Sequence, residues 1–186
     1  QSRSSAASDV YKRQQLRLSQ EGGAFLVNDG KLFVTDTQVT GWREKDNGPA
    51  TFRSPKEFRP FLLSWGGTET YIVNTKMASF GYAKSKSYGV SISQYTPNMA
   101  KRMGRPEPTG WIIGSEFSDM WYGFYCYETQ DFVIKDSTYR DNIVYGIDPH
   151  DRSHRLIIAG NTVYGTKKKH GIIVSREVND LSLIHI

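Results

Sequence analysis

The sequence has a single cysteine and lacks any long hydrophobic run. Cys126 alone cannot form an internal disulfide, and it cannot build a thiolate metal cluster. A membrane-spanning helix needs about 20 consecutive apolar residues, and no such run occurs in these 186 residues. We therefore predict no membrane span and no metal site of this kind.

An excess of charge of one sign is also nearly absent. The formal net charge is +5, and +2 of it lies in the first 14 residues, so the rest of the chain carries only +3. A protein that binds nucleic acid usually concentrates basic residues on one face. The composition therefore predicts no nucleic-acid partner.

Helical periodicity is almost absent from residues 15–180. Short runs of β-branched and aromatic residues alternate with Gly, Asn, Asp and Ser, a pattern that is typical of strands. The ends differ, because residues 1–14 are polar without a period and the chain closes on the apolar string LSLIHI. We interpret residues 1–14 and 181–186 as non-native segments that resemble translated sequencing-adapter sequence, and residues 15–180 as the domain. The alternative is a frayed native tail and a last native strand.

Two patterns repeat in the same order along this domain. The first is an apolar residue, a small polar pair and a second apolar residue, and its copies begin 38, 40, 22 and 24 residues apart. The second is an aromatic residue or His, then Gly, then an apolar residue, with glycines 34, 23 and 25 residues apart. A polar insertion over residues 94–109 accounts for the longer step of the second pattern. The copies of the first pattern are 34–39, 72–77, 112–117, 134–139 and 158–163, and those of the second are 88–90, 122–124, 145–147 and 170–172.

The spacing of these repeats predicts the fold. A period of 22 to 25 residues, with two short strands and no space for a helix, is typical of one coil of a parallel β-helix. Leucine-rich repeats share the period but require a Leu ladder that is absent here. An ordinary β-sandwich would not keep one register over four or five copies. We predict an all-β fold, a single-stranded parallel β-helix.

Stacking the coils on the glycine predicts which side chains share a face. Because neighbouring strand residues point to opposite faces, two columns should lie inside and two outside. The outer columns carry tyrosines and hydroxyls that suit the wall of a groove for a sugar chain. The inner columns are Val90, Phe124, Ile147 and Ile172, and Ile92, Cys126, Pro149 and Val174; the outer columns are Ser91, Tyr125, Asp148 and Ile173, and Ser93, Tyr127, His150 and Ser175.

Ionisable residues concentrate in the segment YGIDPHDRSH, residues 145–154. Three interpretations of it are open. Asp148, His150, Asp151 and His154 could bind a metal, or the aspartates could cap a turn beside solvated histidines. Alternatively, His150 could act in general acid–base chemistry, oriented by a neighbouring aspartate.

Basic residues are expected near this segment. Stacking places Arg176 one coil away from Asp151. The three lysines at residues 167–169 are either a solvated bend or a counter-charge for a polyanion in the groove.

Four segments, EFRPFLLSWGG, WYGFYCYE, YGIDPHDRSH and NTVYGTKKKHGIIVSREVND, follow one another in this order. Through them the chain closely resembles the periplasmic poly(β-D-mannuronate) C5-epimerases of alginate-producing bacteria, from about residue 15 to residue 180. The resemblance implies a right-handed parallel β-helix that converts mannuronate to guluronate within alginate, without calcium or another cofactor. It also implies a periplasmic location and partners in alginate export and modification. The family continues for several more coils beyond residue 180, so we expect truncation to limit the activity of the isolated segment.

The resemblance further implies roles for single residues. His150 resembles the catalytic base, Arg176 the group that neutralises the substrate carboxylate, Asp148 and Asp151 the flanking carboxylates, and Tyr145 a supporting tyrosine. The acid that returns the proton is either water or Tyr145. A uronate lyase and a non-catalytic carbohydrate-binding β-helix are the alternatives. From the outer columns and the lysine run, we expect substrate binding by Tyr125, Tyr127, Ser91, Ser93 and Lys169.

Overall fold

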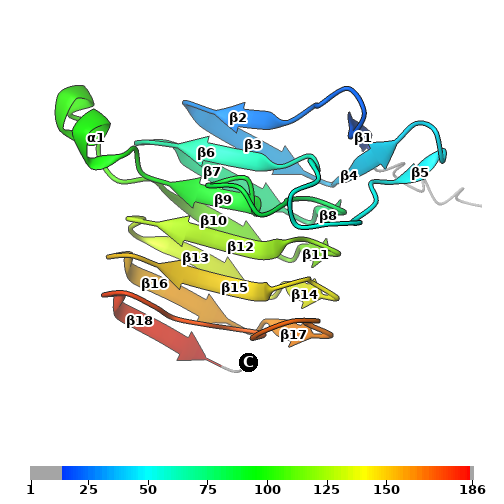
Figure 1. Ribbon diagram of the computed structural model, residues 1–186. Helices are drawn as coiled ribbons and strands as arrows, with labels where there is room; N and C mark the ends of the chain where they lie inside the picture. Colours follow the sequence, from blue (N-terminus) through cyan, green and yellow to red (C-terminus); the bar gives the residue numbers. More distant parts are fainter. Residues whose placement is uncertain (1–13, 185–186) are drawn as a thin grey trace, which may run out of the picture.

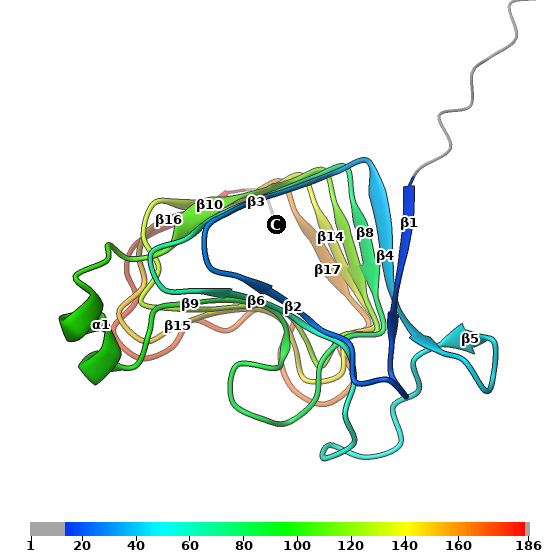
Figure 2. The same ribbon diagram turned by 90° about the horizontal axis from the view of Figure 1, so that it is seen from above.

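The computed structural model describes residues 14–184, which form a stack of coils (Figure 1). Three sheets of parallel strands run along the stack and enclose the core (Figure 2). The predicted parallel β-helix is confirmed.

Each sheet takes one strand from successive coils. The first contains β1 (Gln14–Ser19), β4 (Thr37–Arg43), β8 (Lys76–Ala78), β11 (Glu116–Ser118), β14 (Thr138–Arg140) and β17 (Thr162–Tyr164), with β5 (Gly48–Pro49) antiparallel to β4. The second contains β3 (Lys31–Thr35), β7 (Glu69–Val73), β10 (Thr109–Ile113), β13 (Phe132–Lys135), β16 (His154–Ala159) and β18 (Asn179–Ile184). The third contains β2 (Leu26–Asn28), β6 (Leu62–Trp65), β9 (Gly89–Ser93), β12 (Tyr122–Tyr127) and β15 (Tyr145–His150).

The first sequence repeat determines the register of the first two sheets. Its leading apolar residues pair from coil to coil, and so do its closing apolar residues. Most of these side chains are fully buried, so the repeat forms two walls of the core. The paired columns are Val34, Ile72, Ile112, Ile134 and Ile158, and Val39, Met77, Phe117, Tyr139 and Val163.

The small polar pair of that repeat makes the bend between the two sheets. Its first member has a positive φ in every copy, for example 51° at Asp136, a conformation that Asp, Asn and Gly tolerate. From the second copy on, the side chain of its second member bonds to the coil before it. Ser137 Oγ accepts a hydrogen bond from the amide of Ser115 at 3.1 Å, and Asn161 Oδ1 accepts one from the amide of Ser137 at 3.0 Å. These bonds satisfy backbone donors that a sharp bend would otherwise leave unpaired in the core.

The second repeat stacks in the third sheet, with two corrections to the predicted columns. Gly89 pairs with Tyr122 rather than with Gly123, and the predicted register resumes at Ser91 and Tyr125 after an irregularity. Val174 was predicted inside but is 41% exposed, because its segment forms only isolated bridges and no coil of residues 14–184 packs beyond it. The other members of both inner columns are buried or pack against the core.

The ends and the insertion complete the fold. Residues 1–13 and 185–186 of the predicted non-native segments lie outside the described residues. Gln14 begins β1, and residues 181–184 pair with β16 within β18. Strand pairing does not distinguish a native from a non-native segment, so the non-native origin of residues 1–14 and 181–186 stays a prediction. The insertion forms α1 (Pro97–Met103), and no helix of residues 14–184 is long and apolar enough to cross a membrane.

Candidate active site

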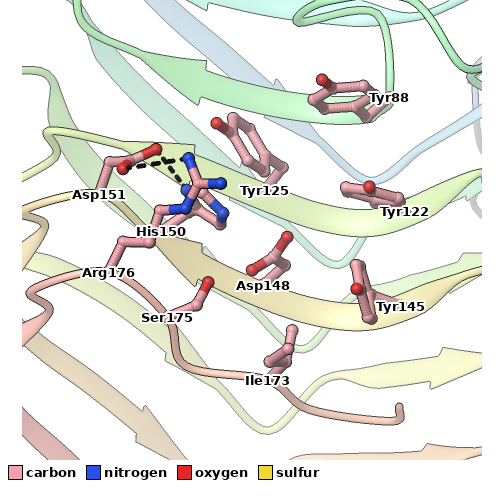
Figure 3. A pocket seen from close by; sticks show the side chains of 10 residues that line it. All are labelled: Tyr88, Tyr122, Tyr125, Tyr145, Asp148, His150, Asp151, Ile173, Ser175 and Arg176. Atoms are coloured by element: carbon pink, nitrogen blue, oxygen red, sulfur yellow. Dashed lines mark hydrogen bonds and ion pairs between the residues drawn. The ribbon is translucent and has the colours of Figure 1, made fainter. Parts of the chain in front are cut away.

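A pocket of about 290 Å³ opens on the outward side of β12 and β15 (Figure 3). Three of its tyrosines, Tyr88, Tyr122 and Tyr145, are the leading residues of the second repeat, and of these only Tyr145 was predicted as a site residue. The lining residues are Tyr88, Tyr122, Tyr125, Tyr145, Asp148, His150, Asp151, Ile173, Ser175 and Arg176.

His150 and Asp151 form a hydrogen-bonded pair at one side of the pocket. β15 ends at His150, and the positive φ of Asp151, 38°, turns the chain at once. This turn brings Asp151 Oδ2 to 2.5 Å from His150 Nδ1. A neutral imidazole that donates from Nδ1 to a carboxylate has its Nε2 available as a proton acceptor.

Arg176 lies next to this pair, as the stacking predicts. Its guanidinium Nη1 is 3.9 Å from Asp151 Oδ1, the contact drawn as a dashed line in Figure 3. The Arg176 backbone is fixed because its carbonyl accepts a hydrogen bond from the amide of Arg152 at 2.9 Å. The side chain itself is 72% exposed, so most of its donors are free to meet a ligand.

Asp148 lies on the floor of the pocket, between His150 and Tyr145 (Figure 3). It is only 2% exposed, and its Oδ1 has no hydrogen-bond partner within residues 14–184. Burial, helped by the charge of Asp151 and opposed by Lys169, raises the pKa of Asp148 to about 7. Near neutral pH, a large fraction of Asp148 is therefore an uncharged acid that can donate a hydrogen bond into the pocket.

Replacing Asp148 by asparagine should stabilise the protein at alkaline pH. Because the folded pKa of Asp148 exceeds that of the unfolded chain, wild-type stability falls as pH rises from about 4 to about 7. Asparagine cannot ionise, so the variant should gain up to about 4 kcal/mol in the free energy of unfolding at pH 8 relative to wild type. Urea unfolding at pH 4.5 and pH 8 measures this gain. An equal difference between the two proteins at both pH values would contradict the assignment.

The tyrosines form a continuous aromatic group over Asp148. The rings of Tyr88 and Tyr122 stack with centroids 4.6 Å apart, and Tyr145 meets Tyr122 edge-on at 4.9 Å. Burial raises the pKa of Tyr88, Tyr122 and Tyr125. These three phenols therefore stay protonated at neutral pH and can donate hydrogen bonds to a sugar.

The structure brings only some of the predicted binding residues to the pocket. Tyr125 lines it, and Lys169 lies beside it with Nζ 5.5 Å from the centroid of the Tyr145 ring. Tyr127 is outside the lining, and the ammonium of Lys86 covers its ring. Ser91 and Ser93 are fully buried, so the expectation that they form a groove surface is wrong. Ser93 Oγ instead donates a hydrogen bond to the backbone at the start of the insertion, the Gln94 carbonyl, at 3.0 Å.

A metal site does not form around the histidines of residues 145–154. His154 Nε2 is 2.8 Å from Glu107 Oε2 of the insertion, and His154 is absent from the pocket lining. Over residues 14–184 no group of three or more His, Cys, Asp and Glu side chains is arranged to hold a metal ion.

Comparison with known proteins gives strong matches to single proteins, although no protein-family model matches the chain. A mannuronan C5-epimerase of Pseudomonas putida is 97% identical over 174 residues, which are 94% of this chain. The predicted resemblance to the mannuronan C5-epimerases is confirmed. A mannuronan C5-epimerase AlgG of Azotobacter vinelandii is 67% identical over 171 residues, 92% of this chain and 33% of that relative. The crystal structure of the periplasmic alginate epimerase AlgG superposes with a TM-score of 0.89 at 70% identity, over 90% of this chain and 40% of that one.

The match to the mannuronan C5-epimerases concerns one part of those proteins. The chain spans about a third of the length of the curated relatives, for example 34% of the Pseudomonas putida protein. That part includes the pocket with His150, Asp151 and Arg176.

Proposed function

We propose that this chain is the part of a mannuronan C5-epimerase that holds the reacting sugar. The substrate would be polymannuronate, and the product would be guluronate within the same polymer. One observation carries the proposal: a hydrogen-bonded His150–Asp151 pair, the exposed guanidinium of Arg176 and a buried acid that is partly uncharged near neutral pH meet in one pocket (Figure 3).

The first requirement of the reaction is to neutralise the substrate carboxylate. Removing the proton from C5 places a second negative charge beside a carboxylate that is already ionised. The Arg176 guanidinium can pair with both oxygens of that carboxylate, where the charge of the enolate develops. Uncharged Asp148 can add a hydrogen bond from the pocket floor without repelling the substrate.

The second requirement is a base and an acid on opposite faces of the sugar ring. His150 Nε2 accepts the C5 proton, and Asp151 stabilises the imidazolium that forms. Tyr145 lies across the pocket from His150, with Asp148 between them (Figure 3). We assign Tyr145, directly or through a water, to the return of a proton from the opposite face, which inverts C5.

Product analysis tests the proposal. The experiment uses this segment within a full-length chain completed from the Pseudomonas putida relative, because the segment spans 34% of that protein. Incubation with polymannuronate should create guluronate signals in the proton NMR spectrum at constant chain length. A lyase would instead create unsaturated ends that absorb in the ultraviolet, and a binding module would leave the polymer unchanged. Either result would overturn the proposal.

Replacing Arg176 by lysine tests whether its positive charge alone, or also the planar pairing of its guanidinium with the substrate carboxylate, is needed for turnover. Lysine keeps the positive charge but cannot pair with both carboxylate oxygens in one plane. We expect turnover to fall about thirtyfold while polymer affinity changes less than threefold, because the lost bonds strengthen in the transition state. Steady-state kinetics on the same full-length protein gives the turnover number, and calorimetry gives the Kd for the polymer. Unchanged turnover would show that the charge alone suffices.

The cellular location and the partner proteins are proposed from the resemblance alone. The related crystal structure is described as a periplasmic alginate epimerase, and we propose the same location for this chain. Partners in alginate export and modification stay a prediction.

A further inference from the structure

Lys86 lies in a loop over residues 82–87 that precedes β9 and falls outside both sequence repeats. The loop closes on itself through a hydrogen bond from the amide of Tyr82 to the carbonyl of Ser87, at 2.9 Å. Tyr82 anchors it against Phe58, with ring centroids 5.4 Å apart. Lys86 itself has a φ of 64°, a left-handed conformation that costs a residue with a Cβ about 1 kcal/mol. The anchored loop thus holds Lys86 in an unfavourable backbone conformation.

The Lys86 ammonium is placed on aromatic faces beside the pocket. Nζ lies 3.4 Å from the centroid of the Tyr127 ring and 5.3 Å from that of Tyr125, a pocket residue. Within residues 14–184, no carboxylate lies within 4.0 Å of this Nζ and no hydrogen bond uses it. Burial lowers the pKa of Lys86 to about 8, opposed by the charges of Asp151 and Glu128. The half-buried Lys86 ammonium therefore has N–H donors without acceptors, and a bound anion would accept these hydrogen bonds and balance the charge.

Lys86 and Arg176 approach the His150–Asp151 pair from opposite directions along the stack. Lys86 comes from the coil of β9 and lies on the tyrosines of β12, whereas Arg176 follows β15. A polymer of uronates carries one carboxylate on every sugar. If Arg176 holds the carboxylate of the reacting sugar, the carboxylate of a neighbouring sugar is left to be neutralised.

We infer that Lys86 is a substrate-binding residue that holds the carboxylate of a sugar next to the one presented to His150. This inference rests on the proposed function. Because that carboxylate does not react, its pairing stabilises bound substrate and transition state equally. Loss of Lys86 should therefore raise KM and the dissociation constant Kd and leave kcat nearly unchanged, in contrast to loss of Arg176.

The test compares Lys86→Gln, Lys86→Arg and the matched control Lys84→Gln, an exposed lysine of the same loop. All are made in the full-length chain defined above, with polymannuronate as the probe. Calorimetric Kd is measured first, because it needs no turnover and so separates failure of this inference from failure of the proposed function. We expect about a tenfold rise in Kd and KM for Lys86→Gln, a change below twofold for Lys84→Gln, and kcat within twofold for both.

The pH dependence gives a second readout, which a purely structural lysine would not produce. As pH rises from 7 to 9, wild type should lose the ammonium and with it affinity, whereas arginine stays charged. Lys86→Arg should therefore retain affinity at pH 9 relative to wild type, and this readout remains if Lys86→Gln does not fold. Wild-type Kd in Lys86→Gln, or the same pH profile in Lys86→Arg and wild type, would overturn the inference.

The ionisable groups around Lys86 are Asp151, Glu128, Tyr125, Tyr127, Cys126 and Arg152. The guanidinium carbon of Arg152 lies 6.0 Å from the centroid of the Tyr127 ring.

Discussion

Replacing His150 by alanine should lower kcat about a thousandfold and change the Kd for polymannuronate less than twofold. His150 supplies the acceptor nitrogen for the C5 proton, and general-base catalysis contributes roughly 10² to 10⁴ in rate. The imidazole is held by Asp151 at 2.5 Å and makes no other described hydrogen bond, so its removal disturbs little else. Because the base acts only once the proton moves, substrate binding should be preserved.

His154→Ala is the matched control for this variant. His154 is four residues further along the chain, but it pairs with Glu107 of the insertion and does not line the pocket. We expect turnover within about threefold of wild type for the control. An equal loss of activity in both histidine variants would indicate damage to the coil and would contradict the assignment of His150 as the base.

Replacing Asp119 by asparagine should destabilise the fold by about 3 kcal/mol. The Arg59 side chain is fully buried, and its Nη2 donates hydrogen bonds to Asp119 Oδ2 at 2.6 Å and to the Asp119 carbonyl at 2.7 Å. Burial lowers the pKa of Arg59, and the charge of Asp119 opposes this. Asparagine leaves the buried guanidinium without a counter-charge, a change that is strongly destabilising. The free energy of unfolding in urea measures the effect.

Asp136→Asn controls for the backbone at this position. Asp136 has a φ of 51°, close to the 50° of Asp119, but its partner Lys135 lies 3.7 Å away on the surface, where ion pairs contribute little. The control should change the free energy of unfolding by less than about 0.5 kcal/mol. Arg59→Met combined with Asp119→Asn should recover part of the lost stability. A loss below 0.5 kcal/mol for Asp119→Asn alone would refute the role of this ion pair.

The register of the coils could be predicted because the bends repeat. Each small polar pair starts with a residue in the left-handed conformation. From the second copy on, it continues with a side chain that bonds to the preceding coil, so the sequence pattern corresponds to a defined backbone geometry. Stacking on the second repeat likewise predicted that Arg176 lies next to Asp151, which the structure confirms. Local sequence determines these features, and they propagate from coil to coil.

Features outside the repeats could not be predicted in this way. Lys86 belongs to a loop without a counterpart in other coils, so no column places it beside the pocket. Ser93 has the position of a groove residue, but its hydroxyl bonds to the Gln94 carbonyl and the side chain is buried. The exposure of Val174 depends on whether another coil packs against its segment. The alternation of strand residues predicts the face on which a side chain lies, but not whether that face is covered.

The most direct test of the account is incorporation of deuterium at C5. The full-length chain that carries this segment is incubated with polymannuronate in deuterated water, and the guluronate formed is analysed by NMR and mass spectrometry. The account predicts that guluronate formed by wild type carries deuterium at C5, and that His150→Ala produces neither guluronate nor deuterated mannuronate. Guluronate that retains its original hydrogen at C5, or wild-type exchange in His150→Ala, would contradict proton removal by His150.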